Sequence, residues 1–237
     1  MSESQDRIER EIQKRREKGE PFAPVEVHRK KSISGSFWGQ LWCRNLETYS
    51  DYEFLLPAGR RYLRSGHVYD LEIETGEVFA YVTGAEIYEV IIRIDSLEEG
   101  CWEEIKASCT GKIDTLVDLL SGNLGDQVLE VVTDPELGLF PSTGEIHFSC
   151  TCPDWADMCK HVAATMYGIG VLLDDRPELF FQLRGVEKSE LLEGALDGAT
   201  NFGSASLATN CGELTPGSLS EIFGIEISDP ESAFLNL

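Results

Sequence analysis

One short segment, SCTCPDWADMCKH at positions 149–161, constrains the fold of this chain more than any other. Three of the seven cysteines and one of the four histidines lie in it, in the order Cys-x-Cys, six intervening residues, Cys-x-His. Zinc in proteins takes four ligands in a tetrahedron, and thiolate sulfur with imidazole nitrogen is the usual set. The segment therefore predicts a Zn2+ site whose ligands are Cys150, Cys152, Cys159 and His161.

The residues around these ligands indicate a strand that leads into a helix. Apolar or cysteine side chains alternate with polar ones from Glu145 to Cys152, which places both cysteines on one face of a strand. We expect Pro153 to end that strand. Cys159 and His161 then lie where a helix begins, because the apolar residues that follow recur with a helical period. The alternative is a cluster of buried free cysteines with a histidine that caps the helix.

The charge of such a site needs compensation. Three thiolates around a dication leave a formal charge of about −1, which the positive end of the helix and Lys160 can offset. Asp154 and Asp157 are candidates for groups that orient the ligands. The residues that could contact a partner from the rim of the finger are Asp154, Trp155 and Lys160. For Trp155 the alternative interpretation is packing on the core.

The pattern Cys-x-Cys-Pro-Asp-Trp, followed by Cys-Lys-His-Val-Ala-Ala, resembles the SWIM-type zinc finger. From about Phe37 to Val186 the chain is similar to stand-alone prokaryotic SWIM proteins. On the family's pattern the zinc ligands are Cys150, Cys152, Cys159 and His161, and none departs from it. The resemblance implies a zinc-binding module that contacts protein or DNA and is not an enzyme. It also implies a protein partner, because these proteins are often encoded beside Swi/Snf-class DNA-translocating ATPases.

The composition favours a cytoplasmic, acidic protein. The chain of 237 residues is 42% hydrophobic and has no run of about eighteen apolar residues, so we expect a folded core and no membrane span. The N-terminal residues lack the apolar core of a signal peptide, and a reducing compartment favours metal over disulfide. The net charge is −22, although residues 1–67 hold thirteen Lys/Arg against ten Asp/Glu. This charge disfavours unaided binding to duplex DNA, which needs a basic face.

The two ends of the chain differ in composition from its centre. Residues 1–31 are polar and charged and predict a flexible N-terminal arm. The arm ends in Arg29, Lys30 and Lys31. We interpret these residues either as part of a solvated arm or as a contact with phosphates or with a partner. Residues 193–237 predict a linker and a short acidic amphipathic segment, which is either a docking peptide or a piece that folds back onto the domain.

Residues 32–135 predict a domain that begins with two helices. Ser36 is placed to cap the first helix, and a short second helix follows. The second helix carries Arg60, Arg61 and Arg64, either as a solvated face or as the place where nucleic acid binds.

Strands and further helices follow in the same domain. Between Val68 and Ile94, three alternating runs joined by short turns predict an antiparallel β-meander. Ser96 and Glu99 predict a capping box for the next helix, and another helix is expected from Lys112 to Leu120. Residues 136–192 predict the zinc finger and a covering helix. The segregated elements favour an α+β fold, with a β-meander, flanking helices and a strand-to-helix Cys3His finger.

The sequence contains no enzymatic constellation that we recognise. It has no GxxxxGKS/T phosphate loop, no GxSxG elbow and no HExxH pair. We therefore predict a non-enzymatic interaction module, an adaptor for a Swi/Snf-type ATPase or a similar nucleic-acid-processing machine. The alternative is a protein that binds DNA or RNA directly through its basic N-terminal quarter and the finger.

Overall fold

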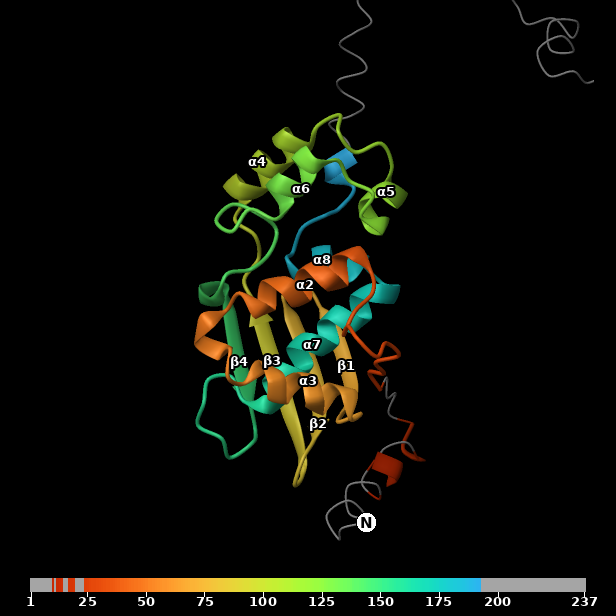
Figure 1. Cartoon of the computed structure of the whole chain (residues 1–237), viewed down its shortest axis with the longest axis vertical. Helices are drawn as coiled ribbons and strands as arrows, with labels where there is room; N and C mark the ends of the chain where they lie inside the picture. The colour runs from red at the N-terminus through yellow and green to blue at the C-terminus, as the bar shows by residue number, and fades with distance from the viewer. Residues whose placement is uncertain (1–9, 11, 15–16, 20–23, 193–237) are drawn as a thin grey trace, which may run out of the picture. The chain divides into compact units, whose positions relative to one another are not determined.

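The computed structural model describes residues 10, 12–14, 17–19 and 24–192, which form an α+β fold (Figure 1). Four strands make one antiparallel sheet in the order β1-β2-β3-β4. The predicted fold class is therefore confirmed. The expectations for residues 193–237, and for most of the arm before Pro24, lie outside the described residues.

The strands are β1 (Val68–Glu74), β2 (Glu77–Thr83), β3 (Ile87–Ile94) and β4 (Ile146–Cys150). The helices named below are α2 (Phe37–Glu47), α3 (Leu56–Arg64), α4 (Glu99–Cys109), α5 (Leu116–Ser121), α6 (Asp126–Val132), α7 (Lys160–Asp175) and α8 (Glu178–Leu183). Two short 3₁₀ turns are η1 (Ser50–Tyr52) and η2 (Thr143–Glu145).

The sheet follows the alternation in the sequence. β1, β2 and β3 form the predicted meander, and Val78 of β2 lies opposite Ile92 of β3. Alternate residues of β2 and β3 are buried, so one face of the sheet is apolar. β4 then pairs with β3, with Cys150 opposite Val90. The strand that carries Cys150 is therefore part of the same sheet as the meander. The predicted boundary between a domain at residues 32–135 and a finger at residues 136–192 stays a prediction.

β4 is shorter than predicted. It ends at Cys150, whereas the alternation predicts a strand through Cys152. The Thr151 N–H still donates to the carbonyl oxygen of Glu89 at 3.0 Å. The chain then bends at Cys152, ahead of Pro153, which cannot donate to a ladder.

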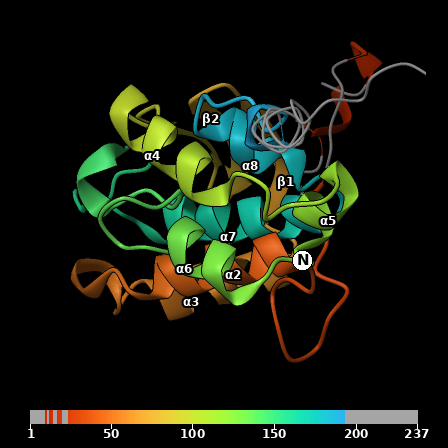
Figure 2. The ribbon, with the colours of Figure 1, turned by 90° about the horizontal axis from the view of Figure 1, so that it is seen from above.

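α7 is the central helix of the fold. It contacts all four strands of the sheet, and α2 and α3 pack against it (Figures 1 and 2). Most of its sixteen residues are buried, and a helix buried on several sides needs apolar residues all round. Figure 2 shows α7 between the sheet and the layer of α2 and α3. Because His161 lies in its first turn, the finger is attached directly to the core.

α2 and α3 approach α7 closely because small residues face one another. A Cβ atom on Gly59 of α3 would lie 2.4 Å from the Cβ of Ala163. A Cβ atom on Gly39 of α2 would lie 2.3 Å from the carbonyl oxygen of Gly170. Ser36 caps α2 as predicted, since its hydroxyl accepts the Gly39 N–H at 3.1 Å.

Two predicted helix starts are wrong. Ser96 and Glu99 form no capping box, because α4 follows directly after Glu98, whose side chain makes no capping hydrogen bond. The helix expected from Lys112 begins later, as α5, because the Thr115 hydroxyl accepts a backbone N–H from its first turn. No helix among the described residues is long and apolar enough to cross a bilayer.

Candidate metal centre

Four side chains that could hold a metal ion converge where β4 leads towards α7. Cys150 ends β4, Cys152 follows it, Cys159 is the N-cap of α7 and His161 lies in the first turn of that helix. Their donor atoms all lie within 4.8 Å of one another. His161 Nδ1 is 3.6 Å from the Cys159 sulfur and 3.9 Å from the Cys150 sulfur. The predicted Cys3His group is therefore formed.

The group fits a tetrahedral metal ion. With bonds of about 2.3 Å to sulfur and about 2.0 Å to nitrogen, neighbouring donors in a zinc site are separated by roughly 3.5–3.8 Å. Both distances to His161 Nδ1 lie close to that separation. Three of the donors are buried and Cys150 is partly buried, so protein would surround the ion. Sulfur and imidazole suit soft or borderline ions rather than Mg2+ or Ca2+, which prefer oxygen.

Backbone N–H groups surround the sulfurs. The Cys152 N–H acts to lower the pKa of Cys150, and the Asp154 N–H acts to lower the pKa of Cys152, although burial and the neighbouring thiols outweigh both. The Val162 N–H donates to the Cys159 sulfur at 3.5 Å. Main-chain N–H groups therefore favour the thiolate form, and the side chain of His161 adds to this effect at Cys159.

The three thiols differ in how readily they lose a proton. Hydrogen bonds from Cys150 and His161 lower the pKa of Cys159 to about 3. The hydrogen bond from the Cys150 thiol to Cys159, together with burial, raises the pKa of Cys150. Burial also raises the pKa of Cys152. Without metal the negative charge therefore lies first on Cys159, and an ion bound to all three sulfurs would displace the remaining protons.

Two tyrosines hold the imidazole of His161. The centroid of its ring lies 4.6 Å from that of Tyr88 and 5.5 Å from that of Tyr62. Its Nε2 atom is buried and has no hydrogen-bond partner among the described residues. Neither tyrosine was predicted to lie beside the ligands, because both are far from the finger along the chain.

The carboxylates of Asp154 and Asp157 do not orient the imidazole, contrary to the prediction, since Nε2 has no described partner. Both side chains are exposed, and Asp154 Oδ1 accepts the Ala156 N–H at 3.3 Å within the loop. Lys160 lies beside the site, with its Nζ 4.7 Å from the ring centroid of Tyr62. A hydrogen bond to Tyr62 raises the pKa of Lys160, and the charge of the Cys152 thiolate adds to the effect.

Trp155 does not pack on the core. At 99% exposed, it is the most exposed large hydrophobic side chain of the described residues. It lies in the loop between Cys152 and Cys159, where Figure 1 shows the chain running from β4 to α7. Asp154 and Lys160 are also exposed, so all three predicted contact residues of the finger are accessible.

The predicted basic residues fall into two groups. Arg60 forms an ion pair with Glu47 and donates to the Tyr167 hydroxyl at 2.9 Å. Arg64 donates to the carbonyl oxygens of residues 29, 30 and 32 at 2.9, 3.2 and 3.1 Å. Both therefore have structural roles that no sequence pattern indicated. Arg60 is partly buried, whereas Arg64 remains exposed, as do the other predicted residues, Arg29, Lys30, Lys31 and Arg61.

Comparison with known proteins gives one informative relative. The uncharacterized protein Rv2102 of Mycobacterium tuberculosis is 33% identical to this chain over 164 residues. The match covers 68% of this chain and 59% of the relative, so the chain spans less than two thirds of that protein. No family model matches the chain, and no solved structure matches it. The chemistry of the site is therefore the main guide to function.

Proposed function

We propose that this protein is a non-enzymatic zinc-binding interaction module of the SWIM type. In this proposal it serves as an adaptor for a Swi/Snf-type ATPase or a similar nucleic-acid-processing machine. One observation carries the proposal: four Cys/His donors within 4.8 Å of one another enclose a loop whose tryptophan is almost fully exposed.

Zinc would act here as a structural staple. Ligands at Cys152 and Cys159 would fix both ends of the loop, which removes conformational freedom before any partner binds. Cys150 and His161 would tie the same ion to β4 and α7. Because loop ordering and ligand deprotonation accompany metal binding, the affinity for zinc would contribute directly to the stability of this region.

The donor set supports a structural ion rather than a catalytic one. Four protein ligands fill a tetrahedral coordination shell, whereas catalytic zinc keeps three protein ligands and a position for water or substrate. The group of four described residues supplies all the donors that such a shell needs. This is the basis for proposing a binding role and no reaction.

Trp155 is the residue that we expect to contribute most to partner binding. A tryptophan buries roughly 150–250 Å2, which at about 25 cal/mol per Å2 corresponds to about 4–6 kcal/mol before the costs of association. Asp154 and Lys160 lie close in sequence as exposed charges of opposite sign, and such charges help to select and orient a partner. Exposed aromatic residues rimmed by polar ones are typical of interaction sites.

The choice of a Swi/Snf-type ATPase rests on the resemblance of the finger to stand-alone prokaryotic SWIM proteins. The net charge of −22 supports a protein rather than duplex DNA as the direct contact. The ion pair of Arg60 with Glu47 points the same way, since it reduces the basic charge available on α3.

The test uses the 237-residue chain, loaded with zinc under reducing conditions, and a Swi/Snf-class ATPase from the same organism. We expect one zinc ion per chain and binding that is lost after chelation. Trp155→Ala should retain zinc but bind at least about tenfold more weakly, as truncation of a central aromatic does. Val117→Ala, which removes a side chain 75% exposed on α5, is the control and should bind normally.

Two results would count against the proposal. Equal binding by Trp155→Ala and the unchanged chain would place the contact elsewhere, and binding by the metal-stripped chain would remove the role of zinc. Direct binding to DNA or RNA is tested by retention on nucleic acid across a salt series, because phosphate contacts weaken steeply with salt. Tight retention that is lost when Arg29, Lys30 and Lys31 are neutralised would favour that alternative.

A further inference from the structure

A hollow of about 500 Å3 lies between α2, α3 and the segment before α2. Four basic side chains line it, and the only acidic side chain among its lining residues is Glu47. The basic residues are Lys31, Arg44, Arg60 and Arg64. Ser32 and Gln40 add neutral polar groups to the wall. The hollow is therefore positive in a chain whose net charge is −22.

Most of this positive charge is uncompensated. Glu47 is already paired with Arg60 and accepts the Tyr167 hydroxyl at 3.1 Å. Lys31 and Arg44 form no ion pair with any described residue, and neither does Arg64. The three hydrogen bonds of Arg64 go to carbonyl oxygens, which position its guanidinium without neutralising it.

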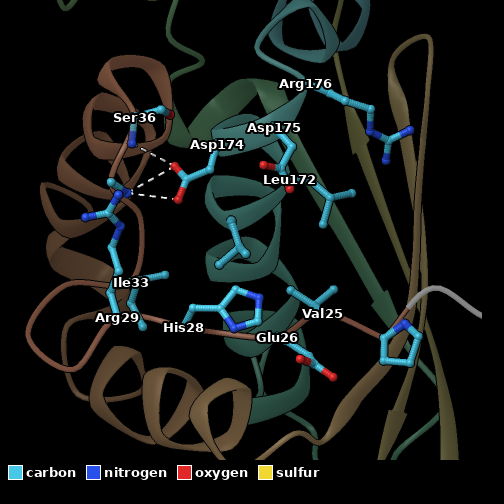
Figure 3. A pocket seen from close by; sticks show the side chains of 13 residues that line it. Val25, Glu26, His28, Arg29, Ile33, Ser36, Leu172, Asp174, Asp175 and Arg176 are labelled. Atoms are coloured by element: carbon cyan, nitrogen blue, oxygen red, sulfur yellow. Dashed lines mark hydrogen bonds between the residues drawn. The ribbon is translucent and has the colours of Figure 1, made fainter.

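The wall of the hollow is held in place from two sides. Arg64 binds the carbonyl oxygens of residues 29, 30 and 32 on one side. On the other side Asp174 of α7 accepts the Ser34 hydroxyl at 2.5 Å. The Asp174 carboxylate also accepts the N–H groups of Gly35 and Ser36, the latter at 2.9 Å (Figure 3). These contacts fix the segment that carries Lys31, so a ligand would not need to order it.

A larger cavity lies on the other side of the same segment and differs in charge. It measures about 650 Å3, and Figure 3 shows His28 and Arg29 in it together with Asp174 and Asp175. Val25 and Leu172 add apolar surface (Figure 3). Its acidic and basic side chains balance and favour no class of ligand, whereas the lining of the hollow beside α3 is mainly basic.

We propose that the hollow beside α3 binds the terminal phosphate of a compact phosphorylated ligand, of the nucleotide or phosphate-ended class. Guanidinium groups match phosphate oxygens with paired hydrogen bonds, which Arg44 can supply, while Lys31 and Arg64 add positive charge. Three uncompensated positive charges suit a group that carries two or three negative charges. This site is separate from the zinc centre, so its failure would leave the adaptor proposal standing.

Compact ligands are favoured because the rest of the chain is acidic. Residues 68–192, which the structure describes, contain seven Lys/Arg against twenty-five Asp/Glu. A long polyanion that extended beyond the hollow would meet repulsion from this charge, whereas one phosphate group would not. A phosphorylated end is therefore preferred over the length of a duplex.

The experiment titrates the zinc-loaded chain with adenosine, AMP and ADP by calorimetry at low and physiological salt. AMP should bind and adenosine should not, and binding should weaken as salt rises. Arg44→Gln and Lys31→Gln should each weaken AMP binding by about tenfold or more, as expected when a hydrogen bond to a charged group is lost. Arg61→Gln, on an exposed part of α3 outside the hollow, is the matched control and should bind AMP normally.

A second comparison separates the two sources of the phosphate. A short oligodeoxynucleotide with a 5′-phosphate is compared with the same strand ending in a 5′-hydroxyl. Preference for the phosphorylated strand, lost in Arg44→Gln, identifies a nucleic-acid end as the ligand, while AMP binding without such preference identifies a free nucleotide. The proposal is overturned if AMP binds no better than adenosine. It is also overturned if Arg61→Gln loses as much affinity as Arg44→Gln, provided that thermal unfolding shows all variants folded.

Discussion

The backbone N–H of Asp154 acts to lower the pKa of the Cys152 thiol, against burial, which raises it. The carboxylate of the same residue points elsewhere, to the Ala156 N–H in the exposed loop. The Cys152 N–H has the same effect on Cys150, and the Val162 N–H donates to the sulfur of Cys159 at 3.5 Å. The polar surroundings of the three sulfurs are therefore built from the path of the main chain rather than from acidic side chains.

Asp154→Ala should leave metal binding intact, because the alanine keeps the N–H that faces Cys152. Asp154→Pro removes that N–H and should weaken zinc binding by about 10–100-fold, the usual cost of losing a partner that supports a ligand. Competition with a chromogenic chelator measures both affinities. An Asp154→Ala protein that lost zinc as readily as Asp154→Pro would show that the carboxylate is needed.

Cys159 has two roles that a pair of variants can separate. Its sulfur is a donor of the metal group and also the N-cap acceptor for the Val162 N–H. Cys159→Ser and Cys159→Ala should both lose stoichiometric zinc. In the metal-free state the serine variant should be more stable by about 1 kcal/mol, because serine is a good N-cap and alanine is not.

Urea unfolding of the two metal-free Cys159 variants, with metal analysis of each, checks this expectation. Cys101→Ser is the control, since Cys101 lies on α4 outside the donor group and its replacement should leave zinc binding unchanged. A Cys159→Ser protein that kept one zinc ion at normal stability would contradict a closed four-ligand site.

Gly59→Ala should destabilise the protein by about 1–3 kcal/mol, the range for overpacking a tight core. The new Cβ would lie 2.4 Å from the Ala163 Cβ and 2.6 Å from the Ala163 carbonyl carbon, so α3 would have to move away from α7. Gly100→Ala is the matched control: nothing lies within 4 Å of its Cβ position in α4, and it should stabilise by about 0.5–1 kcal/mol. Equal effects in denaturant unfolding would show that α3 and α7 are not in tight contact.

Much of the fold could be predicted from the sequence because its signals are local. The meander follows from alternation within single strands, and the four ligands lie within one short segment, so their grouping required no long-range information. The length of β4 could not be read in this way. The alternation continues to Cys152, but it shows only which side chains share a face and not where pairing with β3 ends, which is at Cys150.

Contacts between distant segments were not predictable from patterns. Tyr62 and Tyr88 flank His161 from two other elements, α3 and β3. Arg64 reaches back to the segment before α2, although its place on a basic helix suggested a solvated or nucleic-acid-binding residue. Periodicity shows which face of a helix or strand is buried. It does not show which residues of other elements pack against that face.

Trp155 should account for nearly all of the tryptophan emission that acrylamide quenches in the native protein. The other three tryptophans, Trp38, Trp42 and Trp102, are 0%, 1% and 6% exposed. Trp155→Phe should remove the quenchable component and change the free energy of unfolding by no more than about 0.5 kcal/mol, as is usual for an exposed site. Persistent quenching in Trp155→Phe would mean that a buried tryptophan is accessible.

Asp174→Asn should weaken the fold at neutral pH and matter much less in acid. Burial opposes the charged form, but donors at Ser34, Gly35 and Ser36 outweigh it and lower the pKa of Asp174 below its usual value. A carboxylate with a lowered folded pKa stabilises above its unfolded pKa of about 3.9, and this stability is lost as the pH falls through the folded pKa. The cost of Asp174→Asn should therefore be about 1–2 kcal/mol at pH 7, reduced by the partial exposure of the site, and should shrink below about pH 4.

Asp175→Asn, at the exposed neighbour, is the control and should cost less than about 0.5 kcal/mol in urea unfolding at each pH. A cost for Asp174→Asn that did not change between pH 7 and pH 3 would contradict a stabilising charge at this position.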